Sequence, residues 1–155
     1  MSGLNGIAFP AIEIKREFEE MAIAGRKRWE VRRRPLPLGE PVALVVDGRL
    51  SSFAVFSHGV TAMPAHLGRR VADASGGAAA ELGVADDWLF HYARGRDLFA
   101  YEYDGIARAR LARGVHALFE GRIVSVTSSS RAALEDWQRR MLTRLMKEMT
   151  EGGAR

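Results

Sequence analysis

Hydrophobic and polar residues follow two different periods along this chain. In residues 13–24, apolar residues recur at helical spacing among charges, which predicts a short amphipathic helix. Gly25 follows it and is suited to end the helix in a left-handed conformation. Residues 28–33 then alternate with period two, which predicts a half-buried strand with Trp29 and Val31 facing inward.

Further strands are predicted from β-rich runs and turn signals. Residues 41–46 and 50–57 flank the dipeptide Asp47-Gly48, a strong signal for a β-hairpin. Residues 98–103 alternate between aromatic and other residues with period two, which predicts another strand. The pattern at 106–119 suits either a helix or a strand with a charged face, and we favour a strand. The remaining strand is predicted at 121–126.

Helices are predicted in the second half of the chain. Residues 59–85 are rich in Ala and Gly, so we expect loops there with one or two short helices. Asp86 and Asp87 are placed to begin a helix that carries Trp88 and Tyr92 toward the core. Ser129 or Ser130 is expected to cap a long final helix. Its apolar stripe comprises Leu134, Trp137, Met141, Leu142, Leu145 and Met149.

This order of elements defines the expected fold class. Short strands without regular intervening helices argue against a doubly wound parallel sheet. We predict an α+β fold, a small mixed or closed β-barrel with peripheral helices. At 155 residues, one domain is expected, with the barrel in residues 1–128 and the C-terminal helix, residues 129–155, packed on the same domain.

Composition and charge narrow the function classes. The chain has no cysteine, which excludes disulfides, thiolate metal sites and a cysteine nucleophile. Its four histidines show no metal-ligand spacing, so we expect no metal and no cofactor. No signal peptide or membrane span is evident, and we expect a cytoplasmic protein without membrane contact. The formal net charge of +4 favours polyanionic partners.

The densest charge lies between Arg26 and Arg34, where six basic residues surround the single acid Glu30. Glu30 and Arg32 lie two residues apart and share one face of the predicted strand, so an ion pair between them would hold the guanidinium in place. Lys27 is out of phase with that face, and we place it in the turn after the helix. A Lys at such a site can hold a phosphate, or act as a base if burial lowers its pKa.

The segment Gly25-Arg26-Lys27-Arg28-Trp29-Glu30-Val31-Arg32 matches the Gly-x-Lys-x-x-Glu-x-Arg motif of the ASCH domains. These domains form a superfamily that resembles the PUA RNA-binding domain. The surroundings are similar as well, since a helix precedes the motif, a Gly-containing turn and strand follow it at 38–42, and residues 88–103 resemble the family's late helix and aromatic strand. The resemblance covers about residues 12–119.

The resemblance implies a PUA-like β-barrel with a ligand cleft lined by Lys27, Glu30 and Arg32. Members of the family have been linked to RNA binding and coactivator roles, to ribonuclease activity and to hydrolysis of an acylated cytidine. The amidohydrolase branch carries Thr where this chain has Glu30 and pairs its Lys with a later Glu. The nearest candidates for that later Glu in this chain are Glu81 and Glu102. At these positions the sequence departs from the amidohydrolase branch, so the resemblance supports amidohydrolase activity less than RNA binding.

We therefore predict a protein that binds RNA or a nucleotide, with DNA as a possible ligand. The predicted binding residues are Gly25, Arg26, Lys27, Arg28, Glu30, Arg32, Arg34 and Tyr101. The alternative is a ribonuclease or acylated-cytidine amidohydrolase with Lys27 and Glu30 as catalytic residues. A second alternative is a protein-interaction module, and a monomer and a homodimer are both compatible with the sequence.

Overall fold

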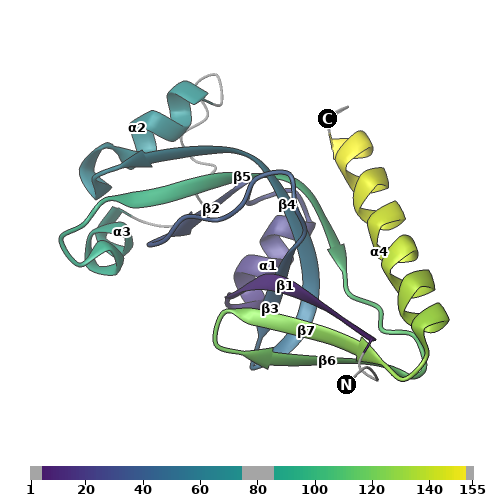
Figure 1. Cartoon of the computed structure of the whole chain (residues 1–155). Coiled ribbons are helices and arrows are strands. Elements are labelled where there is room, and N and C mark those ends of the chain that lie inside the picture. The colour runs from purple at the N-terminus through teal and green to yellow at the C-terminus, as the bar shows by residue number, and fades with distance from the viewer. Residues whose placement is uncertain (1–4, 75–85, 153–155) are drawn as a thin grey trace. The chain divides into compact units, whose positions relative to one another are not determined.

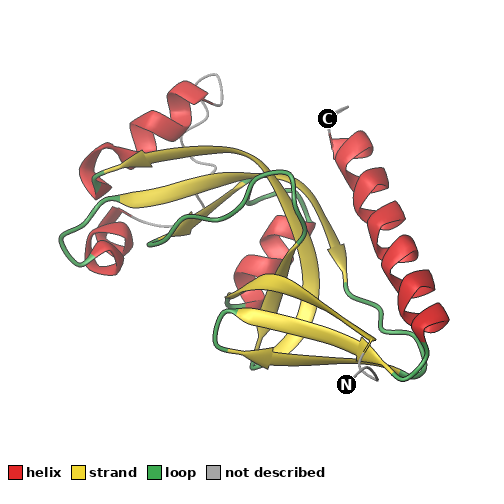
Figure 2. Ribbon diagram, in the orientation of Figure 1, coloured by secondary structure: helices red, strands yellow, loops and turns green. Residues whose placement is uncertain are grey.

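The computed structural model describes residues 5–74 and 86–152, which form seven strands and four helices (Figures 1 and 2). The strands are β1 (Asn5–Glu13), β2 (Trp29–Arg32), β3 (Val42–Val46), β4 (Arg49–Ala62), β5 (Leu98–Arg108), β6 (Val115–Glu120) and β7 (Ile123–Ser128). The helices are α1 (Arg16–Ile23), α2 (Pro64–Ala74), α3 (Asp86–Ala93) and α4 (Arg131–Gly152).

The chain divides into two compact units. Unit 1 comprises Met1–Glu19, Glu40–Val55 and Asp104–Arg155, and unit 2 comprises Glu20–Gly39 and Phe56–Tyr103. Unit 2 therefore holds the whole motif segment together with α2 and α3. The expectation of one domain with the final helix packed on it stays a prediction.

The strands form one mixed sheet in the order β2-β5-β4-β3-β1-β7-β6. β1 and β3 run parallel, whereas β1–β7, β2–β5, β3–β4 and β6–β7 are antiparallel. The predicted α+β class is confirmed, and closure of the strands into a PUA-like barrel stays a prediction. No helix in the described ranges is both long and apolar enough to cross a membrane.

Most predicted elements are confirmed, with shifted ends. α1 ends before Gly25, which has φ +78°, as a left-handed helix cap requires. The β3–β4 hairpin turns at Asp47 and Gly48, whose φ values are +52° and +77°. The predicted strand at 106–119 is in part wrong, because β5 ends at Arg108 and β6 begins only at Val115.

Strand β1 is missing from the sequence-based prediction. Pro10 interrupts its pattern, because proline lacks the N–H that a central strand donates on both sides. In the structure, pairing with β3 begins one residue later, at Ala11, while Pro10 itself lies opposite Ile123 of β7. The proline therefore lies just beyond the two-sided part of the strand.

Strand β4 continues to Ala62, across residues that we predicted as loop. Gly59 is the reason for the error, because we took the glycine as a sign of a loop. Within a strand, a glycine can instead mark a place where a neighbouring group comes close to the backbone. A Cβ at this position would lie 2.9 Å from Cε1 of Tyr101 on β5, so the missing side chain makes room for the ring. The predicted short helix of this region is α2, and residues 75–85 lie outside the described part of the chain.

The core of unit 1 joins its strands to α4. The rings of Phe9 and Phe53 lie 4.9 Å apart, and that of Trp137 lies 6.1 and 5.8 Å from them. Ser130 caps α4, since its Oγ accepts a hydrogen bond from the N–H of Ala133 at 3.1 Å. The predicted apolar stripe is buried at Leu134, Trp137, Met141 and Leu145, but Leu142 is exposed because it lies off this face of the helix.

Gly105 allows α4 to lie directly against β5 in unit 1. A Cβ at this position would come within 2.6 Å of Cγ of Met149 and 3.2 Å of the carbonyl oxygen of Leu145. Gly105→Ala should therefore lower the free energy of unfolding by about 1–3 kcal/mol through overpacking, measured by chemical unfolding. Gly68→Ala is the control, because a Cβ there meets no atom within 4 Å and α2 should tolerate or favour it. Equal stability of the two variants would contradict this account of the packing.

Candidate functional site

The motif segment begins where α1 ends. The N–H groups of Arg26 and Lys27 both donate to the carbonyl oxygen of Met21, at 2.8 and 3.1 Å, and Gly25 has a positive φ between them and the helix. This turn satisfies carbonyl oxygens at the helix end and leads the chain into β2. Lys27 thus lies in the turn after Gly25, as predicted.

Strand β2 pairs antiparallel with β5, which sets the direction of its side chains. Trp29 and Val31 are buried at 0% and 3% exposure in the core of unit 2, as predicted. Glu30 lies opposite Tyr101 in the register and is only 4% exposed. The prediction of a half-buried strand is therefore wrong at Glu30, because aromatic side chains of β5, Tyr101 opposite it and Tyr103 hydrogen-bonded to it, lie on that face as well.

Glu30 is the centre of a polar cluster within unit 2, formed with Lys27, Arg32 and Tyr103 and referred to below as the Glu30 cluster. The hydroxyl of Tyr103 donates to Oε1 of Glu30 at 2.7 Å. A guanidinium nitrogen of Arg32 lies 3.7 Å from Oε2, so the ion pair expected from the strand spacing is confirmed. The Arg32 side chain keeps 24% of its surface exposed, so it contacts both the buried carboxylate and solvent.

Lys27 is a buried member of this cluster, with 2% exposure. Its Nζ donates to the carbonyl oxygen of Trp29 at 2.8 Å. Burial lowers the pKa of Lys27 below its ordinary value, Glu30 partly opposes this, and Arg32 adds to it. The sequence suggested that burial could tune this amine, but its hydrogen bond to a strand carbonyl could not be inferred from the motif.

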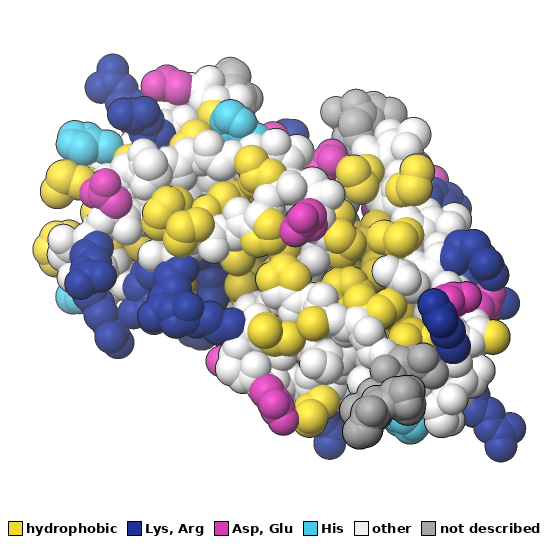
Figure 3. Space-filling model, viewed as in Figure 1, with side chains coloured by type: hydrophobic (Ala, Val, Ile, Leu, Met, Phe, Trp, Pro, Cys, Tyr) yellow, Lys and Arg dark blue, Asp and Glu magenta, His cyan; other side chains and the backbone are white. Residues whose placement is uncertain are grey.

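The structure also places the remaining predicted site residues. Arg26, Arg28 and Arg34 are exposed, and in the view of Figure 3 Lys and Arg side chains gather over the part of unit 2 that carries β2 and α3. Arg28 lies 3.8 Å from Glu102, which sits opposite Trp29 and therefore on the other face of β5 from Tyr101. Of the two later acids considered as partners of Lys27, Glu81 lies outside the described residues.

The aromatic residues of β5 differ in their roles. Tyr101 is 5% exposed, and its hydroxyl accepts a hydrogen bond from the N–H of Leu36 at 2.9 Å. Its ring stacks on that of Phe99, with centroids 6.3 Å apart and planes at 9°. Tyr103, two residues further along the same face, contacts Glu30 instead. Sequence alternation identified this aromatic face, but only the register shows which tyrosine reaches the carboxylate.

A second surface feature was not anticipated. The guanidinium carbon of Arg33 lies 4.7 Å from the centroid of the Tyr92 ring. That ring in turn stacks on Trp88 with centroids 4.5 Å apart and planes at 21°. Trp88 and Tyr92 pack against the core, as predicted, but both remain partly exposed. The spacing of Trp88 and Tyr92 on α3 is visible in the sequence. The contact of Tyr92 with Arg33 is visible only in the structure.

No group of three or more His, Cys, Asp or Glu side chains in the described ranges is placed to hold a metal ion.

Comparison with known proteins gives matches among solved structures. No protein-family model and no curated protein matches the chain. The crystal structure of ASCH from Zymomonas mobilis matches with 22% identity and a TM-score of 0.49, over 62% of this chain and 65% of that chain. Two structures of single-residue variants of that protein match with TM-scores of 0.48 and 0.47.

The match thus spans slightly less than two thirds of the Zymomonas protein. The matched structures are ASCH structures, the family that residues 25–32 resemble. The similarity lies in the arrangement of strands and helices. It gives no information on a ligand of this chain.

The lowered pKa of buried Lys27 leads to a prediction on how stability depends on pH. Because its pKa is lowered in the folded chain, the unfolded chain binds more protons between that lowered pKa and 10.5. Stability of the wild type relative to Lys27→Met should therefore rise as the pH increases through this window. Chemical unfolding from pH 7 to 10.5 measures the difference, with the exposed Lys147→Met as control. Parallel profiles for the wild type and Lys27→Met would contradict the prediction.

Proposed function

We propose that this chain binds RNA or a nucleotide through the surface of unit 2 around β2. The observation that carries the proposal is the burial of Glu30, at 4% exposure, between the hydroxyl of Tyr103 and the guanidinium of Arg32. A buried ionised cluster costs desolvation free energy that apolar residues would not cost. Proteins concentrate such clusters at functional sites, where fixed charges and donors meet a ligand.

The surrounding charge suits a phosphate backbone. Arg26, Arg28, Arg33 and Arg34 are exposed on or beside β2. Arginine forks bind phosphate oxygens bidentately, and several of them supply the salt-dependent part of nucleic-acid affinity. Arg32, already oriented by Glu30, is the residue we assign to a specific phosphate contact.

A base has a stacking partner in the same unit. Trp88 and Tyr92 stack on each other, the guanidinium of Arg33 lies over the Tyr92 ring, and both rings are partly exposed. In this proposal an unpaired base extends this stack. Single-stranded RNA is bound by stacking of unpaired bases on aromatic rings and guanidinium planes. Tyr101, with 5% exposure, contributes in this proposal by supporting the aromatic face, and Lys27 by holding β2 through its hydrogen bond to Trp29.

The proposal includes the fold that the resemblance implies, namely that the strands close into a PUA-like barrel of the ASCH family. Stacking on partly exposed aromatic rings favours single strands over duplexes, and single-stranded DNA stays a possible ligand. The number of chains per bound RNA, measured in the binding experiments below, distinguishes a monomer from a homodimer.

Binding of a labelled single-stranded RNA at several salt concentrations tests the proposal. Arg32→Ala should weaken binding roughly tenfold, since one charge-assisted hydrogen-bonding group is lost. It should also reduce the slope of log affinity against log salt by about one unit. Tyr103→Phe should weaken binding as well, because Glu30 loses a donor that holds it.

Arg122→Ala is the matched control, because Arg122 is an exposed arginine of unit 1. It should retain the affinity of the wild type for RNA. The proposal is refuted if the wild type does not bind RNA, or if Arg122→Ala and Arg32→Ala reduce affinity equally. Single-stranded DNA and duplex RNA of the same length are the comparison ligands.

A second candidate function is hydrolysis at the same cluster, as a ribonuclease or acylated-cytidine amidohydrolase. The observation that favours it is the burial of Lys27 near Glu30, which lowers the pKa of the amine and so increases its uncharged fraction at a given pH. Lys27 would act as base or nucleophile and Glu30 as general acid or base. Binding without turnover remains our first proposal, because Glu30 occupies the position where the amidohydrolase branch carries Thr.

Incubation with labelled RNA and with acylated cytidine tests hydrolysis. Lys27→Met and Glu30→Gln should each reduce turnover by roughly 10²-fold or more, as loss of an acid–base group does. The rate should rise with pH as Lys27 loses its proton. Intact substrates after prolonged incubation with the wild type would exclude both hydrolase activities and leave the binding proposal in place.

A further inference from the structure

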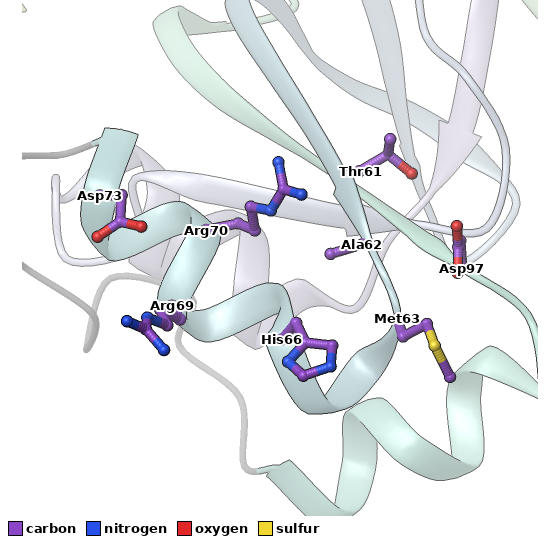
Figure 4. Close-up of a pocket in the computed structure, with 8 residues that line it drawn as sticks. All are labelled: Thr61, Ala62, Met63, His66, Arg69, Arg70, Asp73 and Asp97. Carbon is purple, nitrogen blue, oxygen red and sulfur yellow. The ribbon is translucent and has the colours of Figure 1, made fainter.

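A pocket in unit 2 lies beside α2 and outside the Glu30 cluster (Figure 4). It has a volume of about 560 Å³, and its lining mixes two arginines, Arg69 and Arg70, with two acids, Asp73 and Asp97. Because both charges are present side by side, the pocket indicates no class of ligand. The outer strand of unit 1 has a more definite complement.

Strand β6 is the last strand of the sheet, and its outer edge is suited to pair with another strand. β7 is its neighbour on one side, and no other strand of the described residues pairs with it (Figure 1). Residues 115–120 pair with β7 without a bulge and include neither lysine nor proline. Lysine, proline and bulges are among the features that keep an edge strand from pairing with another chain. β6 lacks all three.

The backbone groups of β6 point to its free edge at alternate residues. The two residues that flank the two-residue turn between β6 and β7 form a hydrogen-bonded pair. The alternation of an antiparallel ladder then turns the N–H and C=O groups of Ala117 and Phe119 away from β7. In the same phase, the N–H of Val115 donates to the carbonyl oxygen of Ala112 at 3.0 Å. Within the described part of the chain, the N–H groups of Ala117 and Phe119 have no such local partner.

The side chains of β6 make the strand complementary to a second copy of itself. His116, Leu118 and Glu120 lie on its outer face and are exposed, Leu118 by 59%. When two copies pair antiparallel with Leu118 opposite its counterpart, His116 of each copy lies opposite Glu120 of the other. On the inner face, the small Ala117 lies opposite the large Phe119 in both directions. In this register each pair of Ala117 and Phe119 exchanges both of its outward backbone hydrogen bonds.

This complementarity is specific to one register. The outward backbone groups repeat every two residues, so the neighbouring registers centre on Ala117 or on Phe119. The first places His116 opposite Leu118, and the second places Glu120 opposite Leu118. Only the register centred on Leu118 pairs the apolar side chains with each other and the polar ones with each other. An imidazole N–H donates to a carboxylate whether or not the ring is charged, so this pairing does not require a protonated histidine.

We infer that two copies of this chain form a two-fold symmetric dimer through antiparallel pairing of their β6 strands. The same patch serves on both sides, as a two-fold interface requires. Main-chain hydrogen bonds between the two edges hold the dimer together, and the pairs of His116 with Glu120 fix the register. Pairing over a few residues buries less area than a standard interface, so we expect an affinity in the micromolar range. The inference concerns unit 1 and does not rest on the function proposed for β2.

Sedimentation equilibrium of the full chain over a range of concentrations tests the inference. The wild type should change from monomer to dimer in the micromolar range. Leu118→Lys should raise the dissociation constant at least roughly tenfold, because two like charges then lie opposite each other at the centre of the interface. Met146→Lys is the matched control, since Met146 is an apolar residue of α4 in unit 1 with 66% exposure. It should associate as the wild type does.

A charge exchange tests the register. His116→Glu places two carboxylates opposite each other, and Glu120→Lys removes the acceptor for the imidazole. Because each change occurs twice in a symmetric dimer, each single variant should weaken association roughly tenfold. The double variant restores a pair of opposite charges at both places and should recover most of the wild-type affinity.

Three outcomes would overturn the inference. The first is a wild type that stays monomeric at millimolar concentration. The second is a Met146→Lys variant that dissociates as readily as Leu118→Lys, because the copies would then meet through α4. The third is a double variant that associates no more tightly than His116→Glu or Glu120→Lys alone. The substituted side chains are exposed in the single chain, and circular dichroism confirms that each variant is folded.

Discussion

The antiparallel register between β2 and β5 determines the chemistry of unit 2. It places Glu30 opposite Tyr101 and Trp29 opposite Glu102. Because strand side chains alternate, this single pairing sends Trp29 and Val31 to the core and Glu30 to the aromatic face. A slip of one residue would reverse both faces, exposing the tryptophan and bringing the charge of Glu30 into the core. The hydrogen bond between Tyr103 and Glu30 exists only in the observed register.

Local signals predicted a large part of the fold because they act over a few residues. The Asp47-Gly48 turn, the left-handed Gly25 and the Ser130 cap each depend on the conformation of one or two residues. Pro10 and Gly59 misled the prediction for the opposite reason. Their meaning depends on a partner strand, since Pro10 lies where β3 has not yet begun to pair and Gly59 makes room for the ring of Tyr101.

At the candidate site, too, features set by neighbouring residues could be predicted, and features set by a distant strand could not. Spacing along β2 was sufficient to pair Glu30 with Arg32, and the helix end was sufficient to place Lys27. The burial of Glu30 could not be predicted, because it depends on residues of β5, about seventy residues later in the chain. For the same reason the sequence did not identify Tyr103, whose hydroxyl the structure places on Glu30, while the predicted ligand contact of Tyr101 stays a prediction. The stack of Arg33, Tyr92 and Trp88 likewise joins two distant segments.

The contact between Gly59 and Tyr101 has a consequence for how the sequence can change over evolutionary time. The two positions share one volume, since the tyrosine ring occupies the space that a side chain at 59 would need. A side chain at 59 becomes acceptable only after the ring at 101 has been lost, and that loss also removes the hydroxyl that binds the backbone at Leu36. Substitutions at 59, 101 and the segment around 36 should therefore be accepted together, in a restricted order.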